Sequence, residues 1–430
     1  MSAQLIGFLC IAGMLGMIAL RMPIAMAMAA TGFIGFGLIS AFDPALTILQ
    51  RSAMSTLTSY SFSPIPMFIL MGVLASKARM SAELFHGAKS LFGAWRGGMA
   101  LAAVSSCGVF SAISGSSLAT AASMSKVALP EMRARGYADS LSTGTIAAGG
   151  TLGIMIPPSI ALLLYALITE QSVGDMFIAG IVPGLIGLGL YLLTIAIVVA
   201  IKPSLATPGD PTTLKEKLVG LKGLVPFTGI FVLIIGGIYT GLFTPTEAAS
   251  VGAFGALLIA LYRGMRLREF VAAVRETLVI SAMIFFMVIG AEIFGYFINV
   301  SRISFELVQI VNAMELTPLM VLMAILLLYL LLGMVMDSIA MLLLTVPVVF
   351  PLAMAAGLDP IWFGIITVIT VELGLITPPI GMNVFVIKSV APKDTKLTDI
   401  FKGVLPFVAA DAVRLALIIA FPVLALGLIS

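Results

Sequence analysis

The sequence predicts an all-α polytopic membrane protein, and three observations support that fold class. Hydrophobic residues make up 60% of the 430 residues and charged residues only 10%, whereas a soluble domain usually carries about 25% charged residues. Many apolar stretches have the length of about 17–25 residues that a helix needs to cross a bilayer. The 42 glycines and 22 prolines are tolerated in membrane helices where broken backbone is buried or lines a cavity.

The apolar stretches with the length of a bilayer are predicted membrane-crossing segments. The first has no basic region before it and no small-residue cleavage site, so we expect a retained helix there. The segments lie near residues 4–20, 23–40, 60–76, 140–168, 176–201, 224–241, 246–262, 277–299, 361–387 and 403–425.

Two further apolar stretches, 97–129 and 318–353, are interrupted near the middle by small or polar residues. The interruptions are 114–117 (Ser-Gly-Ser-Ser) and 336–338 (Met-Asp-Ser). Each arm is too short to cross a bilayer comfortably. We therefore expect two re-entrant helical hairpins, each with its tip inside the membrane.

Basic residues fall almost entirely on one side of this layout, and the loops of the other side hold only Arg51 and Arg302. The side rich in Lys and Arg is expected to be cytoplasmic. Both termini are then predicted to be periplasmic. The first hairpin would enter the membrane from the cytoplasm and the second from outside.

A polar linker at 202–222 divides the chain into two halves that share sequence features at one fixed offset. Ser117 matches Ser338, and the pair Pro157-Pro158 matches Pro378-Pro379. Each half has an odd number of crossings, so we expect the halves to be inverted repeats. The predicted units are a first repeat 1–201 (scaffold about 1–90, hairpin and broken helix about 91–175) and a second repeat 223–430 (scaffold about 223–315, hairpin and broken helix about 316–390).

Inverted repeats with broken helices at matching positions are typical of secondary transporters with a site at the membrane midplane. Proline removes an amide donor and clashes with the preceding turn, so each proline pair should open its helix. The freed carbonyl groups suit Na⁺, and the half-helix N-termini suit a carboxylate. The candidate Na⁺ ligands are Ser114, Gly115, Ser116, Ser117, Gly150 and Thr151 in the first half, and Gly333, Asp337, Ser338, Glu372 and Thr377 in the second. The candidate substrate contacts are Ser116, Ser117, Pro157, Ser159, Pro379 and Asn383.

Simpler interpretations of these residues stay open. Small residues such as Gly153 and Gly374 also let membrane helices pack closely. A carboxylate at membrane depth, as at Asp337, marks either an ion path or a buried partner. For Glu247 and Glu292 we expect hydrogen bonds between helices or contacts with a partner subunit.

Other titratable residues have structural interpretations. Asp411 and Arg414, three residues apart, should neutralise each other on one helix face. We expect no disulfide or metal site at Cys10 or Cys107, and a surface position for His86. There is no Walker-type loop and no nucleophile–base pair, so we do not expect an enzyme.

The motifs in both halves resemble those of one known family. The relevant segments are 112–132, 147–184, 333–337 and 377–383, which carry the hairpin tips and the Pro-Pro breaks. They look like the large membrane subunit, DctM type, of tripartite ATP-independent periplasmic (TRAP) transporters. The resemblance covers essentially the whole chain, and the motifs are specific in combination.

The resemblance implies import of a small organic acid, such as a C4-dicarboxylate or sialic acid, across the bacterial inner membrane. Na⁺ would be the coupling ion. The architecture would be that of an elevator-type ion transporter, in which a scaffold holds a moving domain of two hairpins and two broken helices. A small four-helix membrane subunit, expected on a separate chain, and a periplasmic substrate-binding protein would be the partners. The lipid bilayer would surround the chain, and no nucleic acid would be involved. A stand-alone Na⁺/dicarboxylate symporter and an ion antiporter or channel are the alternatives.

Overall fold

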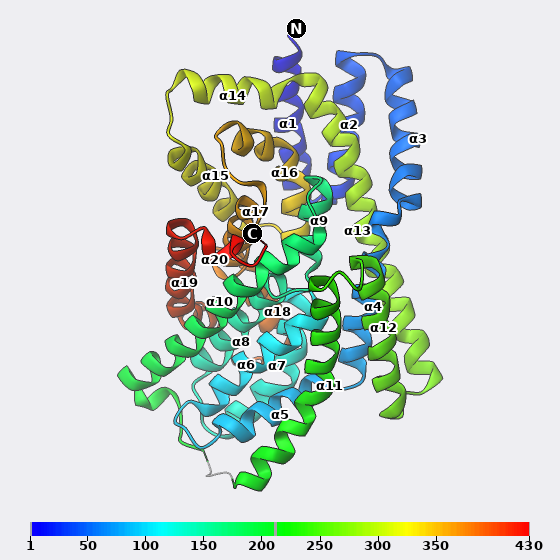
Figure 1. Ribbon diagram of the computed structural model, residues 1–430. Helices are drawn as coiled ribbons and strands as arrows, with labels where there is room; N and C mark the ends of the chain where they lie inside the picture. Colours follow the sequence, from blue (N-terminus) through cyan, green and yellow to red (C-terminus); the bar gives the residue numbers. More distant parts are fainter. Residues whose placement is uncertain (1, 210–212, 430) are drawn as a thin grey trace.

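A computed structural model describes residues 2–209 and 213–429. Figure 1 shows that the described chain is built of helices alone. In chain order these are α1 (Ala3–Ala19), α2 (Ile24–Ile39), α3 (Phe42–Thr58), η1 (Tyr60–Phe62), α4 (Pro64–Lys77), α5 (Met80–Phe92), α6 (Gly98–Ser114), α7 (Ser117–Ala134), α8 (Asp139–Met155), α9 (Ile160–Ile168), α10 (Val173–Ile201), η2 (Pro203–Leu205), α11 (Leu214–Tyr239), α12 (Pro245–Tyr262), α13 (Leu267–Ser301), α14 (Ile303–Ala313), α15 (Pro318–Gly333), α16 (Ser338–Ala355), α17 (Pro360–Ile376), α18 (Met382–Val390), α19 (Leu397–Ala420) and α20 (Val423–Leu426).

One group of helices is organised around α13, which is 35 residues long. Helix α2 packs along its C-terminal part, where Gly32 lies against the backbone of Ile293. Helix α4 packs along its N-terminal part, where Lys77 pairs with Glu276. Helices α1, α3, α11 and α12 complete this group. Because α13 exceeds the roughly 20 residues that cross a bilayer, it can join helices at both ends of the molecule.

Helix α3 is a correction to the sequence interpretation, which placed Arg51 in a loop between two spans. Residues Phe42–Thr58 are helical, and this helix meets the segment Tyr60–Lys77 at an angle of 57°. The sequence hid this helix because Asp43, Gln50 and Arg51 interrupt its apolar pattern.

The two predicted hairpins are present. Helices α6 and α7 form the first, and α15 and α16 form the second. In Figure 1 the first hairpin lies in the lower half of the molecule and the second in the upper half. Helices α5 and α14 run across the view near its lower and upper ends, and each leads directly into one hairpin.

Both Pro-Pro pairs interrupt their helices, as predicted. Helix α8 ends at Met155 and α9 begins at Ile160, while α17 ends at Ile376 and α18 begins at Met382. The predicted spans 140–168 and 361–387 are therefore each two helices joined by an irregular break. Both halves share an order of elements. Helices of the first group are followed by α5 or α14, then by a hairpin, a broken helix and a long helix, α10 or α19.

By length and composition, seven helical spans of the described residues could cross a membrane, with α8 and α9 counted together as one, or eight if the bent pair α3–α4 also counts as one span. Ten crossings were predicted. Helices α1 and α2, with 17 and 16 residues, lie at the lower end of the range of about 17–25 residues for a crossing. The predicted linker 202–222 is also partly helical, because α11 begins at Leu214; its residues 210–212 lie outside the described part.

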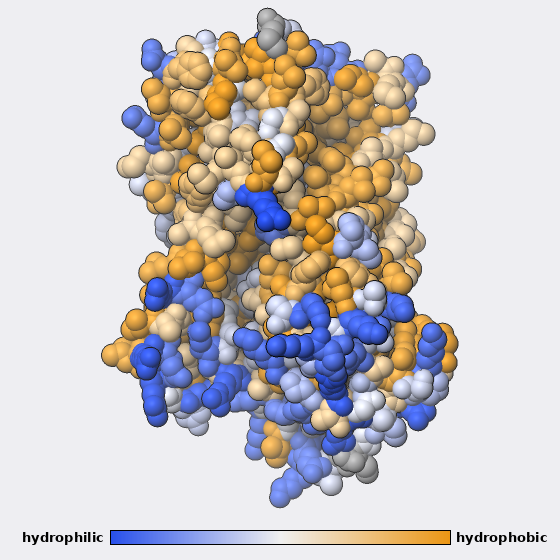
Figure 2. All heavy atoms as spheres, turned by 180° about the vertical axis from the view of Figure 1, so that it is seen from behind, coloured by the Kyte–Doolittle hydropathy of each residue, from blue (hydrophilic) through white to orange (hydrophobic). Residues whose placement is uncertain are grey.

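The surface supports a multi-pass membrane protein. In Figure 2, hydrophobic residues cover most of the upper part of the face shown, and hydrophilic residues gather towards its lower end. Large side chains such as Leu20, Leu242 and Leu267 are exposed. A soluble monomer rarely exposes so large a continuous apolar surface. The described chain therefore presents this surface to lipid.

Candidate functional site

The tip of the first hairpin is closed by its own polar groups. Gly115 adopts a left-handed backbone conformation with φ +58° at the end of α6, which a residue with a side chain rarely adopts. Ser116 caps α7 by accepting from the backbone N–H of Ala119 at 3.4 Å. The hydroxyls of Ser114 and Thr120 lie 2.6 Å apart. These hydroxyls and the reversed chain together form a compact polar turn.

A hydrogen bond joins this tip to the second half of the chain. The Ser117 hydroxyl donates to Oδ1 of Asn383 at 3.2 Å, and the Asn383 amide donates to the carbonyl of Ala147 at 3.2 Å. Asn383 is fully buried in the first turn of α18. It therefore connects the first hairpin, the first broken helix and the second broken helix.

Glycines let the first tip approach the first broken helix closely. A Cβ atom at Gly153 would lie 2.7 Å from the carbonyl oxygen of Ser116, and one at Gly150 would lie 2.8 Å from the Ala121 side chain. The backbone N–H of Ile160 donates to the carbonyl of Gly115 at 3.4 Å. The packing role considered for Gly153 is therefore confirmed, and the tip lies directly against the break.

The second tip meets the second broken helix in a similar way. A Cβ atom at Gly374 would lie 2.7 Å from the Cα of Gly333, and the N–H of Gly381 donates to the carbonyl of Met334 at 3.2 Å. Asp337 is the N-cap of α16, and its Oδ1 accepts from the N–H groups of Ile339 and Ala340. Both N–H groups bind the same carboxylate oxygen, so an ion at this tip would compete with them for Oδ1 only.

The remaining break residues differ in exposure between the halves. Pro157 and Ser159 are buried, and the Ser159 hydroxyl caps α9 and bonds back to the carbonyl of Ile154. Pro379 is exposed and Thr377 partly exposed. The Thr377 hydroxyl donates to the carbonyl of Leu373 at 2.6 Å. The first break is thus enclosed by protein, whereas the second reaches the surface.

Ser338, a further candidate ligand, is the first residue of α16 and is partly exposed. It lies beside Asp337 at the tip, as the sequence interpretation expected. Two other candidate ligands, Thr151 and Glu372, point elsewhere.

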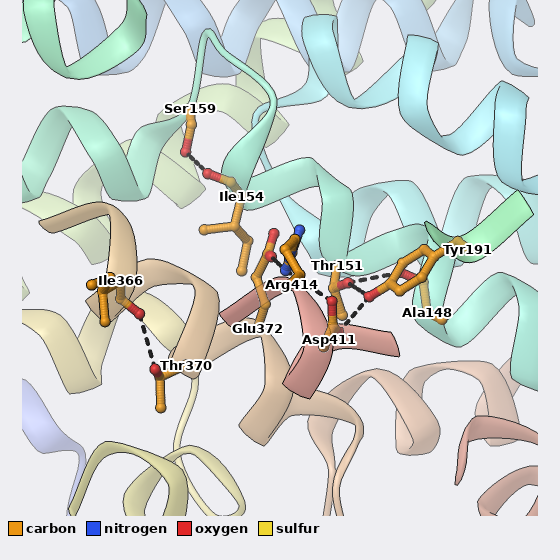
Figure 3. Close-up of polar contacts among 10 residues, drawn as sticks. All are labelled: Ala148, Thr151, Ile154, Ser159, Tyr191, Ile366, Thr370, Glu372, Asp411 and Arg414. Atoms are coloured by element: carbon orange, nitrogen blue, oxygen red, sulfur yellow. Dashed lines mark hydrogen bonds and ion pairs between the residues drawn. The ribbon is translucent and has the colours of Figure 1, made fainter. Parts of the chain in front are cut away.

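Figure 3 shows Thr151 and Glu372 in one buried network with Tyr191, Asp411 and Arg414. The Arg414 guanidinium pairs with the Glu372 carboxylate, and it lies 3.0 Å from Oδ1 of Asp411. The Tyr191 hydroxyl donates to Oδ2 of Asp411 at 2.5 Å, and lies 3.1 Å from the hydroxyl of Thr151. Glu372 therefore faces an arginine, and the assignment of this carboxylate to a Na⁺ site loses its geometric basis.

The sequence interpretation paired Asp411 with Arg414, which the structure confirms, but it missed the third partner. Glu372 and Arg414 lie 42 residues apart on different helices. At the fixed offset between the two halves, Glu372 matches Thr151 in sequence. That match was the one available signal that the two residues would lie in the same network.

Two other acidic residues have distinct surroundings. Glu292 accepts from the hydroxyls of Ser55 and Thr56 on α3, at 3.1 Å and 2.8 Å, so the expected bond between helices is confirmed. Glu247 instead forms a capping box with Thr244 at the start of its own helix, which corrects the expectation of a bond between helices. Its carboxylate accepts from the N–H of Thr244 at 2.8 Å.

A cavity of about 480 Å³ lies beside Glu292. Its lining comes from α3 and α13 of the first helix group, and from α9 and α16 of the hairpin and broken-helix group. The cavity therefore separates the two groups of helices locally.

His86 lies exposed on α5, 3.6 Å from Glu131.

Two hairpin tips packed on two proline-broken helices are the arrangement that the sequence motifs predicted. Over residues 11–424 the sequence matches the family described as the DctM component of the tripartite ATP-independent periplasmic transporters. The chain belongs to this family. The resemblance seen in the motifs is confirmed.

Relatives of this TRAP large-subunit chain support the assignment. It is 37% identical over 401 residues to the C4-dicarboxylate TRAP transporter large permease protein of Pseudomonas aeruginosa, with 92% of this chain and 93% of that protein covered. It is 33% identical over 384 residues to an isethionate TRAP transporter permease, DctMQ, of Oleidesulfovibrio alaskensis. That match covers 87% of this chain but only 60% of the relative, which is the longer protein.

A solved structure has the same overall fold. The YdaH transporter of Alcanivorax borkumensis superposes with a TM-score of 0.63, covering 89% of this chain and 90% of that one. Sequence identity is 14%, so this likeness concerns the fold alone. The predicted all-helical transporter fold is confirmed.

Proposed function

We propose that this TRAP large permease imports a small organic acid across the bacterial inner membrane with Na⁺ coupling. The proposal is supported by the packing of each hairpin tip on the helix break of its own half, and by the bond from Ser117 of the first tip to Asn383 after the second break. Opened backbone with hydroxyl and amide groups is suited to a cation and a carboxylate together. The Pseudomonas aeruginosa relative, a C4-dicarboxylate permease, makes a C4-dicarboxylate the first substrate to test.

Na⁺ would bind at the two tips in this proposal. The first set of oxygen ligands would come from Ser114 to Ser117 with Gly150, and the second from Asp337, Ser338 and Thr377 near Gly333. Hydroxyl, carbonyl and carboxylate oxygens are suitable ligands for a hard cation. Thr151 and Glu372 are left out because they belong to the buried network.

Substrate would bind between the tips, next to Asn383, Ser116 and Ser117, with the breaks at Pro157 and Pro379 bordering the binding site. Ser159 holds the first break by capping α9. A half-helix N-terminus attracts a carboxylate through its unpaired N–H groups and its dipole. A dicarboxylate could meet one such end from each half.

Movement of the hairpin and broken-helix group against the α13 group would carry the load across the membrane. Two features support an elevator of this kind: α5 and α14 each join one group to the other, and a cavity of about 480 Å³ opens between the groups beside Glu292. Both termini would lie on the periplasmic side, following the distribution of basic residues.

A small membrane subunit and a periplasmic binding protein are the proposed partners. The name DctMQ of the isethionate relative, of which this chain covers 60%, is consistent with a second membrane component. Both partners must therefore be present in a functional test.

Uptake by proteoliposomes tests the whole proposal. The permease, the small subunit and the binding protein are reconstituted together, and labelled C4-dicarboxylate accumulation is measured under an inward Na⁺ gradient. We expect accumulation with Na⁺ and none with an equal K⁺ gradient. Accumulation without the binding protein would instead support a stand-alone symporter, and Na⁺ flux without substrate would support an ion antiporter or channel.

A further inference from the structure

The network of Glu372, Asp411 and Arg414 has an uneven charge. All three side chains have no exposed surface, and two carboxylates share a single guanidinium. Both carboxylates lie against the same nitrogen, Nη2 of Arg414. If both acids were ionised, one negative charge would be buried without compensation, which is strongly unfavourable in a low-dielectric interior.

No neighbouring helix supplies the missing positive charge among the described residues. The charged groups that act on Glu372 are Arg414 and Asp411, both from α19. Helix α10 adds the neutral hydroxyl of Tyr191, and α8 adds that of Thr151. Packing also fixes the guanidinium, because Gly187 of α10 lies directly against Arg414, where a Cβ atom would overlap it.

We propose that this network binds one proton, and that Glu372 carries it as a neutral carboxylic acid. With that proton, one carboxylate and one guanidinium remain, so the buried charges balance. The inference concerns the network itself and does not rest on the proposed transport activity.

Geometry assigns the proton to Glu372 rather than to Asp411. The Asp411 carboxylate receives the Tyr191 hydroxyl at 2.5 Å and lies 3.0 Å from the guanidinium, so its ionised form has two stabilising neighbours. On Glu372, Oε2 meets the guanidinium and Oε1 has no hydrogen-bond partner; Oδ1 of Asp411 also lacks a hydrogen bond, so the Tyr191 hydroxyl is the contact that distinguishes the two acids. Glu372 also lies near the C-terminal end of α17, where the helix dipole disfavours a negative charge.

Infrared spectroscopy of the purified full-length protein at neutral pH tests the proposal without any transport assay. A protonated carboxylic acid gives a carbonyl-stretching band that shifts on deuteration. We expect the wild-type minus Glu372→Gln difference spectrum to contain this band. In wild-type protein the same band should shift with ¹³C-carboxyl glutamate and stay in place with ¹³C-carboxyl aspartate.

Charge balance leads to a second, independent prediction for the infrared band. Asp411→Asn removes the surplus charge, so Glu372 should ionise against Arg414 and the band should disappear. Each single variant keeps the network neutral and should remain folded, whereas the double variant leaves Arg414 unpaired and should unfold at a clearly lower temperature.

Three results would overturn the proposal. One is a wild-type spectrum without the band, and another is a band that follows the aspartate label. The third is a Na⁺-dependent thermal stabilisation of wild-type protein that Glu372→Gln abolishes while no protonated band is seen, since a metal cation would then be balancing the charge.

Discussion

Ser117 and Asn383 are 266 residues apart in sequence and are joined by a hydrogen bond of 3.2 Å between two fully or nearly buried side chains. Ser117 begins the second arm of the first hairpin, and Asn383 lies in the first turn of the helix that follows the second break. This bond makes the first hairpin dependent on the second half of the chain.

Asn383→Ala should impair both stability and uptake. It leaves the Ser117 hydroxyl and the Ala147 carbonyl without their partner, and an unsatisfied buried polar group costs about 1–3 kcal/mol. A double-mutant cycle with Ser117→Ala, read by thermal unfolding and by uptake, measures the contact itself. The two effects should be clearly less than additive; simple additivity would show that the two side chains act independently.

Gly153→Ala should push the first hairpin tip away from its broken helix. The new Cβ would lie 2.7 Å from the Ser116 carbonyl oxygen, and such overpacking typically costs about 1–3 kcal/mol. We expect a lower unfolding temperature and slower Na⁺-driven uptake. Gly189→Ala is the matched control, because nothing lies within 4 Å of the Cβ position there. Equal effects of the two substitutions would contradict the close-packing role.

Two substitutions of Asp337 distinguish a capping role of this residue from an ion-binding role. Asp337→Ala removes both the cap of α16 and the charge, whereas Asp337→Asn keeps an oxygen that can accept from Ile339 and Ala340. If Na⁺ binds this carboxylate, both variants should lose Na⁺-dependent uptake. Retention of full Na⁺ dependence by Asp337→Asn would limit the residue to capping.

Arg414→Met should be among the most destabilising substitutions in the chain. It leaves the buried Asp411 and Glu372 without their cation, and removing one partner of a buried ion pair costs about 3–5 kcal/mol. Thermal unfolding in detergent measures the effect. Arg268→Met, at an exposed position on α13, should change the unfolding temperature little, and a similar loss in both variants would argue against a special role for Arg414.

The loop after α18 provides a pH-dependent contact outside the membrane segments. A hydrogen bond from Arg133 lowers the pKa of Asp394 below its usual value. A carboxyl with a lowered folded-state pKa adds stability above its unfolded pKa of about 3.9, and that stability is lost as pH falls through the folded pKa.

Asp394→Asn should therefore be slightly less stable than wild type at neutral pH, and the difference should vanish in strong acid. Unfolding temperatures measured across that range check the sign. Asp43→Asn, on the exposed start of α3, is the control. A difference that grows as pH falls would contradict the ion-pair explanation.

The local backbone features of the site could be predicted from sequence because they depend on residues that are neighbours in the chain. Proline pairs open a helix wherever they stand, and Ser-Gly-Ser or Met-Asp-Ser sequences interrupt an apolar run, so both hairpins and both breaks were found near their observed positions. Helix α3 was missed because Asp43, Gln50 and Arg51 interrupt its apolar pattern.

By itself the sequence determined a helical membrane chain with two hairpin tips and two opened helices, because apolar length, proline and glycine act over a few residues. Only the tertiary structure decided which polar groups meet: Ser117 with Asn383, and Glu372 with Arg414 rather than with a tip. Such pairings depend on how helices from both halves pack. In an interior where every charge and polar group needs a partner, that packing fixes what each residue can do.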